Sequence, residues 1–233
     1  MTDSRASSLQ IVGNLLFGIY AWIVFVMSVL AAIFCTLLVP GLTRRRQCVS
    51  FFARLPLQLA GVHTDINGWE KIPPCDCIVV ANHASYLDGV ILQGFLPPRF
   101  SYVIKGEMRN FPVVRILLRR IGSKFVERFE ASGSARDARE LLRAASAGES
   151  LALFPEGTFI KDRGLGRFRS GAFAAAIKAG VPVVPVVISG SRHIMPAGKV
   201  LPRHGHIRID ILNPIEPSDR AFASSKALAE EAR

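Results

Sequence analysis

Charged residues are missing from one long stretch of this sequence, and acidic residues are in short supply throughout it. No Asp, Glu, Lys or Arg occurs between Arg5 and Arg44. Cysteine is also rare, with 4 in 233 residues, which excludes a small disulfide-rich scaffold. Half of the residues are hydrophobic, so the chain can bury a sizeable core and intrinsic disorder is excluded.

The uncharged stretch contains an almost continuous apolar run at 11–39. A helix needs about 20 apolar residues to cross the ~30 Å hydrocarbon layer of a bilayer. We therefore expect residues 1–43 to form a retained membrane anchor. A cleaved signal peptide, a buried core helix, and a re-entrant pair of shorter helices broken at Gly13 and Gly18 are the alternatives.

Positive charges follow this apolar run. Arg44, Arg45, Arg46 and Arg54 come after it, whereas Arg5 alone precedes it. Lys and Arg accumulate on the cytoplasmic side of membrane segments, so we expect the rest of the chain on the cytoplasmic face of a bacterial-type inner membrane. The arginines that follow the run would then lie against anionic lipid headgroups.

The remainder of the chain is strongly basic. All but one of the 29 Lys and Arg and all but one of the 18 Asp and Glu lie from residue 44 onwards, so the net charge of +11 belongs there. A basic domain beside a membrane favours acidic lipids or phosphate-bearing substrates as partners. Nucleic acid is not expected, because no ladder of aromatic and basic residues supports it and it would not need an anchor.

The cysteines show no metal-site pattern. Cys75 and Cys77 form a C-x-C pair without a second pair at ligand spacing, so a zinc site is not expected from them. In a cytoplasmic domain, the thiols are expected to be reduced.

Residues 44–233 are expected to form one α/β domain. Short apolar runs typical of buried strands alternate with segments of helical pattern. This alternation predicts a mixed, mostly parallel central sheet flanked by helices. Strands are expected at 62–66, 77–81, 100–104, 124–126, 150–154, 183–188 and 206–212. Helices are expected at 88–96, 111–120, 134–147, 170–179 and over about the last 15 residues.

A histidine and a carboxylate follow the strand expected at 77–81, in the segment NHASYLD at 82–88. On a continuous helix their side chains would point about 140° apart, so His83 and Asp88 can meet only if the chain turns between them. Asp88 would then fix the tautomer of the imidazole while the other ring nitrogen takes a proton. The alternative is a helix-capping Asp88 beside an ordinary loop histidine.

Three further segments lie where an expected strand gives way to a loop. In FPEGT at 154–158, Pro155 and Gly157 around Glu156 predict a rigid turn that exposes the carboxylate, or an ordinary surface turn. In GSKFVER at 122–128, Arg128 is placed to fork onto a phosphate, or is simply solvated. VPVVPVVISG at 181–190 is most simply a core strand.

Several well-known catalytic motifs are missing. The sequence has no G-x-S-x-G elbow, no P-loop, no G-x-G-x-x-G and no H-E-x-x-H. Without a placed Ser or Cys nucleophile, a His–Asp pair is expected to deprotonate a hydroxyl of the substrate itself. Together with Arg128 and the anchor, this predicts acyl transfer onto a lipid-phosphate acceptor.

In this order and spacing, the four segments resemble the four sequence blocks of the glycerolipid acyltransferase family, in particular its bacterial-type 1-acylglycerol-3-phosphate acyltransferases. The stretch from Lys105 to Pro112 resembles the sequence between the first two blocks. The resemblance covers residues 62–214, roughly two-thirds of the chain. It implies an α/β fold of the glycerol-3-phosphate acyltransferase type.

The resemblance also implies a reaction. His83 would be the general base on the acceptor hydroxyl, and Asp88 would orient it. The acyl group would come from acyl-CoA or acyl carrier protein and move to the sn-2 hydroxyl of lysophosphatidic acid without an acyl-enzyme. The product would be phosphatidic acid for phospholipid biosynthesis, and the resemblance implies no metal and no cofactor.

Five more residues match the family blocks and would bind substrate. Arg128 would bind the phosphate of the acceptor, and Lys105 is a further candidate for that phosphate. Glu156, Gly157 and Thr158 would shape the glycerol-phosphate site.

The chain departs from the family pattern at a few positions. Arg115 stands where many relatives have Gly, and Ser123 and Lys124 make the second block more polar than usual. These departures leave the acceptor open, so a lyso-ornithine lipid or another lysophospholipid is an alternative. A non-catalytic membrane lipid-binding protein on the same fold is the alternative from another functional class.

Overall fold

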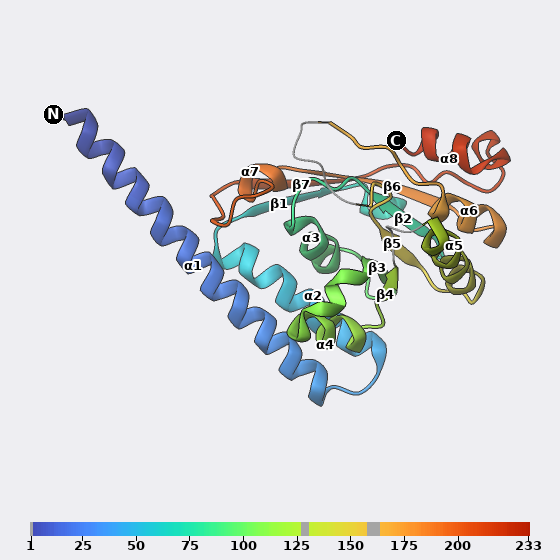
Figure 1. The fold of residues 1–233 in the computed structure, drawn as a ribbon, viewed down its shortest axis with the longest axis horizontal. Coiled ribbons are helices and arrows are strands. Elements are labelled where there is room, and N and C mark those ends of the chain that lie inside the picture. The colour runs from blue at the N-terminus through green and yellow to red at the C-terminus, as the bar shows by residue number, and fades with distance from the viewer. Residues whose placement is uncertain (1, 127–130, 158–163) are drawn as a thin grey trace.

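The computed structural model describes residues 2–126, 131–157 and 164–233. These residues form a mixed sheet of seven strands in the order β1-β7-β6-β2-β5-β3-β4 (Figure 1). The strands are β1 (His63–Asn67), β2 (Ile78–Ala81), β3 (Ser101–Lys105), β4 (Lys124–Val126), β5 (Leu151–Leu153), β6 (Val183–Ser189) and β7 (His206–Ile211). The predicted fold class is confirmed, and every expected strand is present.

Strand direction defines one functional edge of the sheet. The neighbouring strands β6, β2, β5, β3 and β4 all run parallel. β7 is antiparallel to β6, and β1 is parallel to β7. The carboxyl ends of the five parallel strands therefore lie at the same edge as the amino ends of β7 and β1. In α/β sheets, ligand sites form at the carboxyl ends of the parallel strands.

Helices cover both faces of the sheet. They are α1 (Thr2–Leu38), α2 (Leu42–Leu59), α3 (Leu87–Phe95), α4 (Pro112–Arg120), α5 (Ala131–Ser146), α6 (Gly171–Ala179), α7 (Ser191–Ile194) and α8 (Ser225–Glu231). Single 3₁₀ turns lie at η1 (Trp69–Lys71), η2 (Gly106–Asn110) and η3 (Arg220–Ala223). All the expected helices of the domain are confirmed. α2 was not predicted, because three consecutive arginines and an internal Pro56 hide its apolar periodicity.

The central strand β2 explains why the sheet is buried on both faces. Ile78 and Val80 pack in a core with residues of α5, α6 and α8. Val79 and Ala81 pack in a second core with residues of α2 and α3. All four side chains are at most 2% exposed, and burying each large one contributes about 1.5–3 kcal/mol. This two-sided burial produces the unbroken apolar run seen in the sequence.

The N-terminal segment is one continuous helix, α1, that passes through Gly13 and Gly18 without a break. The alternative of a re-entrant pair broken at these glycines is therefore wrong. The chain turns after α1 at Gly41, whose φ of 81° suits glycine. α2 then returns along α1, so the two helices form a hairpin (Figure 1).

The first half of α1 also contacts the loop that precedes β7. The indole Nε1 of Trp22 donates a hydrogen bond to the carbonyl of Val200 at 2.7 Å. The ring of Phe17 stacks on His204 with 3.6 Å between centroids. α1 therefore contacts the body of the protein near its middle, through this loop, and along α2, with which it forms the hairpin.

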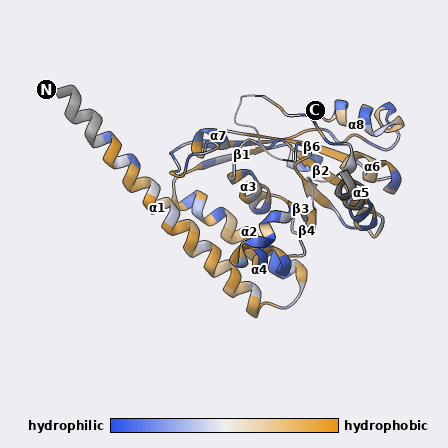
Figure 2. Ribbon diagram, in the orientation of Figure 1, coloured by the Kyte–Doolittle hydropathy of each residue, from blue (hydrophilic) through white to orange (hydrophobic). Residues whose placement is uncertain are grey.

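By length and composition, Gln10–Leu38 of α1 can cross a membrane. Most of its large apolar side chains point outwards, and Ile11 and Phe34 are each 65% exposed. Figure 2 shows the hydrophobic residues along this helix. A continuous apolar surface of this kind marks a membrane or protein contact. The division into an anchor at 1–43 and a domain at 44–233 stays a prediction.

A disulfide joins the helical hairpin. Cys35 of α1 and Cys48 of α2 are bonded, with their Cα atoms 6.8 Å apart. The prediction of reduced thiols is wrong for this pair, because the unpredicted α2 brings the two residues together. Cys75 and Cys77 are free.

Arg46 has a different role from the one predicted. Its guanidinium is buried and donates hydrogen bonds to the carbonyls of Ile121 at 2.9 Å and Arg99 at 2.8 Å, and to Ser101 Oγ at 2.6 Å. The expectation that it lies against lipid headgroups is therefore wrong, whereas Arg44 is exposed. Burial lowers the pKa of the Arg46 guanidinium. Arg46 fastens α2 to the start of β3.

Candidate active site

His83 and Asp88 meet at the carboxyl end of β2, as the sequence predicted. His83 follows β2 directly after Asn82, and Asp88 lies in the first turn of α3. The chain turns between them, so that His83 Nδ1 lies 3.0 Å from Asp88 Oδ2. With Nδ1 committed to Asp88, Nε2 is the ring nitrogen that can accept a proton.

The carboxylate of Asp88 is completely buried. Besides His83, its Oδ2 accepts hydrogen bonds from the backbone N–H groups of Ala84 at 2.6 Å and Ser85 at 2.7 Å. Three donors on one oxygen, at the positive end of α3, stabilise a buried negative charge. The helix-capping alternative for Asp88 is wrong, because the N-cap of α3 is Tyr86 and no side chain caps it. The carboxylate of Asp88 instead contacts His83 and accepts hydrogen bonds from the loop that precedes the helix.

Hydrogen bonds fix the loop around His83 on both sides. The side chain of Asn82 donates to the carbonyl of Ile188 at 3.0 Å and accepts from its N–H at 2.7 Å. Ser85 Oγ donates to the carbonyl of Met195 at 2.8 Å. The loop is thereby tied to β6 and to the end of α7, which limits the positions that the imidazole can take.

Glu156 lies beside His83 but does not present an exposed carboxylate. Its Oε1 accepts the backbone N–H of His83 at 2.7 Å, and its Oε2 accepts that of Gly166 at 2.7 Å. The side chain is buried, so the predicted exposure is wrong. The cause is that the loop after β2 and the segment before α6 each offer it a backbone donor. Glu156 therefore positions His83 and the segment that leads to α6.

Two further contacts shape the site after β5. The ring of Phe154 stacks on the imidazole of His83, with 4.1 Å between centroids and 12° between planes. At Gly157, where φ is 83°, an added Cβ would lie 2.7 Å from Nε of Arg169. Glycine at this position therefore allows a guanidinium to approach the backbone. Arg169 is a basic group near the site that the sequence reading did not single out.

Of the other predicted substrate residues, only Lys105 is in the described part of the chain besides Glu156 and Gly157. It ends β3 at the same edge of the sheet, and its Nζ forms an ion pair with Glu107 at 2.5 Å. Arg128 and Thr158 lie outside the described residues. Their roles stay predictions, as do the roles of the other substrate residues.

The structure adds a basic pocket on the other side of His83. It has a volume of about 520 Å³ and is lined in part by Ala84, Arg192, His193 and Arg203. Three of these residues can carry positive charge, and Ala84 is the neighbour of His83. The sequence shows little signal for this pocket, because Arg192 and His193 lie on α7 whereas Arg203 lies in the loop before β7.

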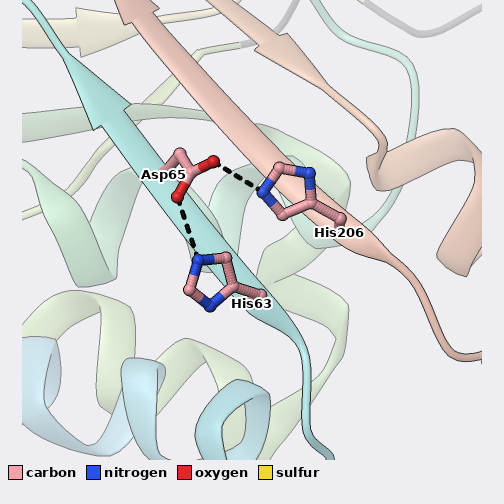
Figure 3. A group of neighbouring side chains, drawn as sticks. All are labelled: His63, Asp65 and His206. Atoms are coloured by element: carbon pink, nitrogen blue, oxygen red, sulfur yellow. Dashed lines mark hydrogen bonds and ion pairs between the residues drawn. The ribbon is translucent and has the colours of Figure 1, made fainter.

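Among the residues that the structure describes, one group of three metal-ligating side chains converges. It consists of His63, Asp65 and His206, on β1 and β7 (Figure 3). It does not include His83 or Asp88.

Comparison with protein families identifies the region that contains this site. The family model described as Acyltransferase matches residues 63–189, which is more than half of the chain. The match begins at β1 and ends at the last residue of β6, so it includes His83, Asp88 and Glu156.

The names of individual relatives specify one acyltransferase reaction. A chloroplastic 1-acyl-sn-glycerol-3-phosphate acyltransferase, BAT2 of Brassica napus, is 35% identical over 173 residues, which cover 73% of this chain and 48% of the relative. A 1-acyl-sn-glycerol-3-phosphate acyltransferase of Haemophilus influenzae is 32% identical over 142 residues, covering 60% of this chain and 58% of the relative. The chain spans about half the length of the curated relatives it matches.

A solved structure matches over nearly the full length. The crystal structure of the 1-acyl-sn-glycerophosphate (LPA) acyltransferase PlsC from Thermotoga maritima superposes with a TM-score of 0.79 and 26% sequence identity. The match covers 95% of this chain and 92% of that one, so it includes the helical hairpin as well as the sheet.

The contacts of Glu156 predict a loss of stability when its carboxylate is removed. Glu156→Ala leaves two backbone N–H groups without their acceptor, so the free energy of unfolding should fall by about 1–3 kcal/mol. Glu70→Ala removes an exposed glutamate and should change the free energy of unfolding by less than about 0.5 kcal/mol. Chemical denaturation of the detergent-solubilised protein measures both values, and equal losses would contradict the positioning role.

Proposed function

The chain belongs to the acyltransferase family, and we propose that it transfers a fatty acyl group from an acyl thioester to the sn-2 hydroxyl of 1-acylglycerol-3-phosphate, forming phosphatidic acid. The observation that carries this proposal is the 3.0 Å contact between His83 Nδ1 and Asp88 Oδ2 at the carboxyl end of β2. Relatives that bear the name of this activity support the choice of acceptor.

The chemistry proceeds in two steps at His83. Nε2 takes the proton of the acceptor hydroxyl as its oxygen attacks the thioester carbonyl, which forms a C–O bond and a tetrahedral oxyanion. The intermediate then collapses, the C–S bond breaks, and the imidazolium returns its proton to the departing thiolate. Asp88 stabilises the imidazolium between these steps. No covalent acyl-enzyme forms, because the nucleophile belongs to the substrate.

The two substrates approach His83 from opposite sides along the edge of the sheet. β2 lies between β6 on one side and β5, β3 and β4 on the other. We place the acceptor phosphate on the β3–β4 side, where Lys105 ends β3 and Arg128 follows β4 by two residues. Glu156 and Gly157, with Thr158 next in sequence, shape the floor of this half.

The acyl donor takes the other half of the site. Acyl-CoA and acyl carrier protein both carry phosphate on the arm that presents the thioester. The pocket of about 520 Å³ beside Ala84 offers Arg192, His193 and Arg203 to such phosphates. Its place on the β6 side keeps the anionic part of the donor away from the acceptor phosphate, which lowers the repulsion between them.

The protein acts at a membrane, and α1 is the anchor. The exposed apolar surface of α1 supports this, as does the lipid nature of the acceptor. We place the catalytic domain on the cytoplasmic face, because arginines accumulate after α1 rather than before it. The Cys35–Cys48 disulfide is the opposing observation, since disulfides are uncommon in the cytoplasm.

Replacing the base should abolish transfer without unfolding the protein. With lysophosphatidic acid and radiolabelled acyl-CoA, His83→Ala should lower the rate of phosphatidic acid formation by about 10²–10⁴-fold, which is the usual contribution of a general base. Asp88→Asn should also lower kcat heavily, because the imidazole loses its charged partner. His63→Ala, which removes an exposed histidine of β1 outside the active site, is the matched control and should stay near wild type.

The same assay offers glycerol-3-phosphate and a lyso-ornithine lipid beside lysophosphatidic acid. If the label appears only in another product, the proposed acyl transfer stands and the assignment of lysophosphatidic acid as the acceptor is wrong. If neither acyl-CoA nor acyl carrier protein gives any transfer, a non-catalytic lipid-binding protein replaces the proposed enzyme.

The placement of the two substrates predicts a split in Michaelis constants. Arg128→Ala should raise KM for lysophosphatidic acid by about tenfold or more and leave KM for the donor unchanged, because a charge-assisted hydrogen bond contributes about 1.5–3 kcal/mol. Arg203→Gln should raise KM for the acyl donor and leave KM for lysophosphatidic acid unchanged. Steady-state kinetics with each substrate varied in turn measures the split, and an unchanged acceptor KM in Arg128→Ala would remove Arg128 from phosphate binding.

The side of the membrane can be tested through Cys75, which is exposed and free. Burial raises the pKa of the neighbouring Cys77 thiol to about 12, so Cys75 is the thiol that reacts. A membrane-impermeant maleimide should label right-side-out spheroplasts of an expressing bacterium only after lysis, with Cys75→Ser as the unlabelled control. Labelling of intact spheroplasts would place the domain outside.

A further inference from the structure

Three metal-ligating side chains lie on the same face of β1, an edge strand of the sheet, and of its neighbour β7. His63 and Asp65 are two residues apart on β1, so they point to the same side of the sheet. His206, the first residue of β7, is the register partner of His63. On β7 the alternate residues Ile207 and Ile209 are buried, which turns His206 to the outer face.

The side chains converge on one point (Figure 3). His63 Nε2 lies 3.0 Å from Asp65 Oδ1, and His206 Nε2 lies 2.9 Å from Asp65 Oδ2. The two imidazole rings stack with 5.4 Å between their centroids. One ligand atom from each of the three residues lies within 4.8 Å of the others. The carboxylate is thus held between two imidazole nitrogens.

The neighbouring charged side chains of Arg208 and Asp210 contact each other, and Asp65 contacts the two histidines. Arg208 is the register partner of Asp65, but its Nε forms a hydrogen bond at 2.9 Å with Asp210. Asn67 donates to the same carboxylate at 2.8 Å, and these contacts lower the pKa of Asp210. Asp210 therefore balances the guanidinium, so that Arg208 does not compete for Asp65.

We propose that His63, Asp65 and His206 form a binding site for a divalent transition-metal ion of the Zn²⁺ type. Two imidazoles and one carboxylate suit Zn²⁺ and its neighbours in the first transition row, whereas Mg²⁺ and Ca²⁺ prefer oxygen ligands throughout. Three protein ligands leave one position of a tetrahedral ion for water. The imidazoles exchange their hydrogen bonds to Asp65 for bonds to the metal, which needs only rotation of exposed side chains.

The site is separate from the reaction. β7 and β1 lie two and three strands from β2, which at about 4.8 Å per strand is roughly 10–15 Å from His83. The metal therefore does not touch the reacting atoms. A metal bound by these residues joins β1, which is an edge strand, to its neighbour β7 and so to the body of the sheet. Because β1 directly follows the helical hairpin, the metal reinforces the attachment of the hairpin.

The direct test is Zn²⁺ binding by the full-length, detergent-solubilised protein in competition with a chromogenic chelator, with Cys75 alkylated so that its thiol does not contribute. The wild type should bind one equivalent. His63→Ala, His206→Ala and Asp65→Asn should each weaken this binding by about tenfold or more, because each removes one of three protein ligands. His204→Ala, two residues from His206, is the matched control and should bind as the wild type does.

Thermal unfolding gives a second readout. Binding to the folded state alone raises Tm, so Zn²⁺ should raise the Tm of the wild type and of His204→Ala, and should leave that of the His63→Ala/His206→Ala double variant unchanged. Two results would overturn the site: one equivalent of Zn²⁺ retained by the double variant, or a Tm rise with Mg²⁺ equal to that with Zn²⁺. Acyl transfer is not part of either readout, so the outcome is independent of the proposed reaction.

Discussion

The buried carboxylate of Asp88 is the group on which the geometry of the site depends. A completely buried negative charge is costly unless several donors satisfy it. Here Oδ2 collects His83 Nδ1 and two backbone N–H groups within 3.0 Å, at the start of α3. These bonds can form only if the chain turns sharply after β2. The requirement to satisfy one charge therefore shapes the loop and orients the imidazole together.

A second buried carboxylate repeats this arrangement from the neighbouring strand. Glu156 follows β5, which pairs with β2, and it accepts the backbone N–H of His83. His83 is consequently held through its ring by Asp88 and through its main chain by Glu156. Phe154 adds a ring stacked on the imidazole. In the proposed reaction, the substrates therefore meet a base that is already in position, which reduces the reorganisation that transfer requires.

The sequence predicts most of this arrangement, and its failures have a common cause. The strands and the meeting of His83 with Asp88 follow from local patterns, because apolar runs and a five-residue spacing are visible within one segment. The burial of Glu156, the hydrogen bonds of Arg46 and the Cys35–Cys48 disulfide were not predicted. Each depends on a partner from a distant segment, such as His83 after β2, Ile121 after α4, or the α1–α2 hairpin.

The contacts of α1 connect its apolar surface to the side of the site on which we propose that the acyl donor binds. A second pocket, of about 580 Å³, lies between Ile11 and Leu15 of α1 and the loop at 198–203. Arg203 lines both this pocket and the basic pocket beside Ala84. An apolar wall on α1 thus gives way to cationic side chains over the length of one loop. This order of surfaces suits the proposed donor, which has an acyl chain at one end and phosphate at the other, because each part would meet a surface of its own kind.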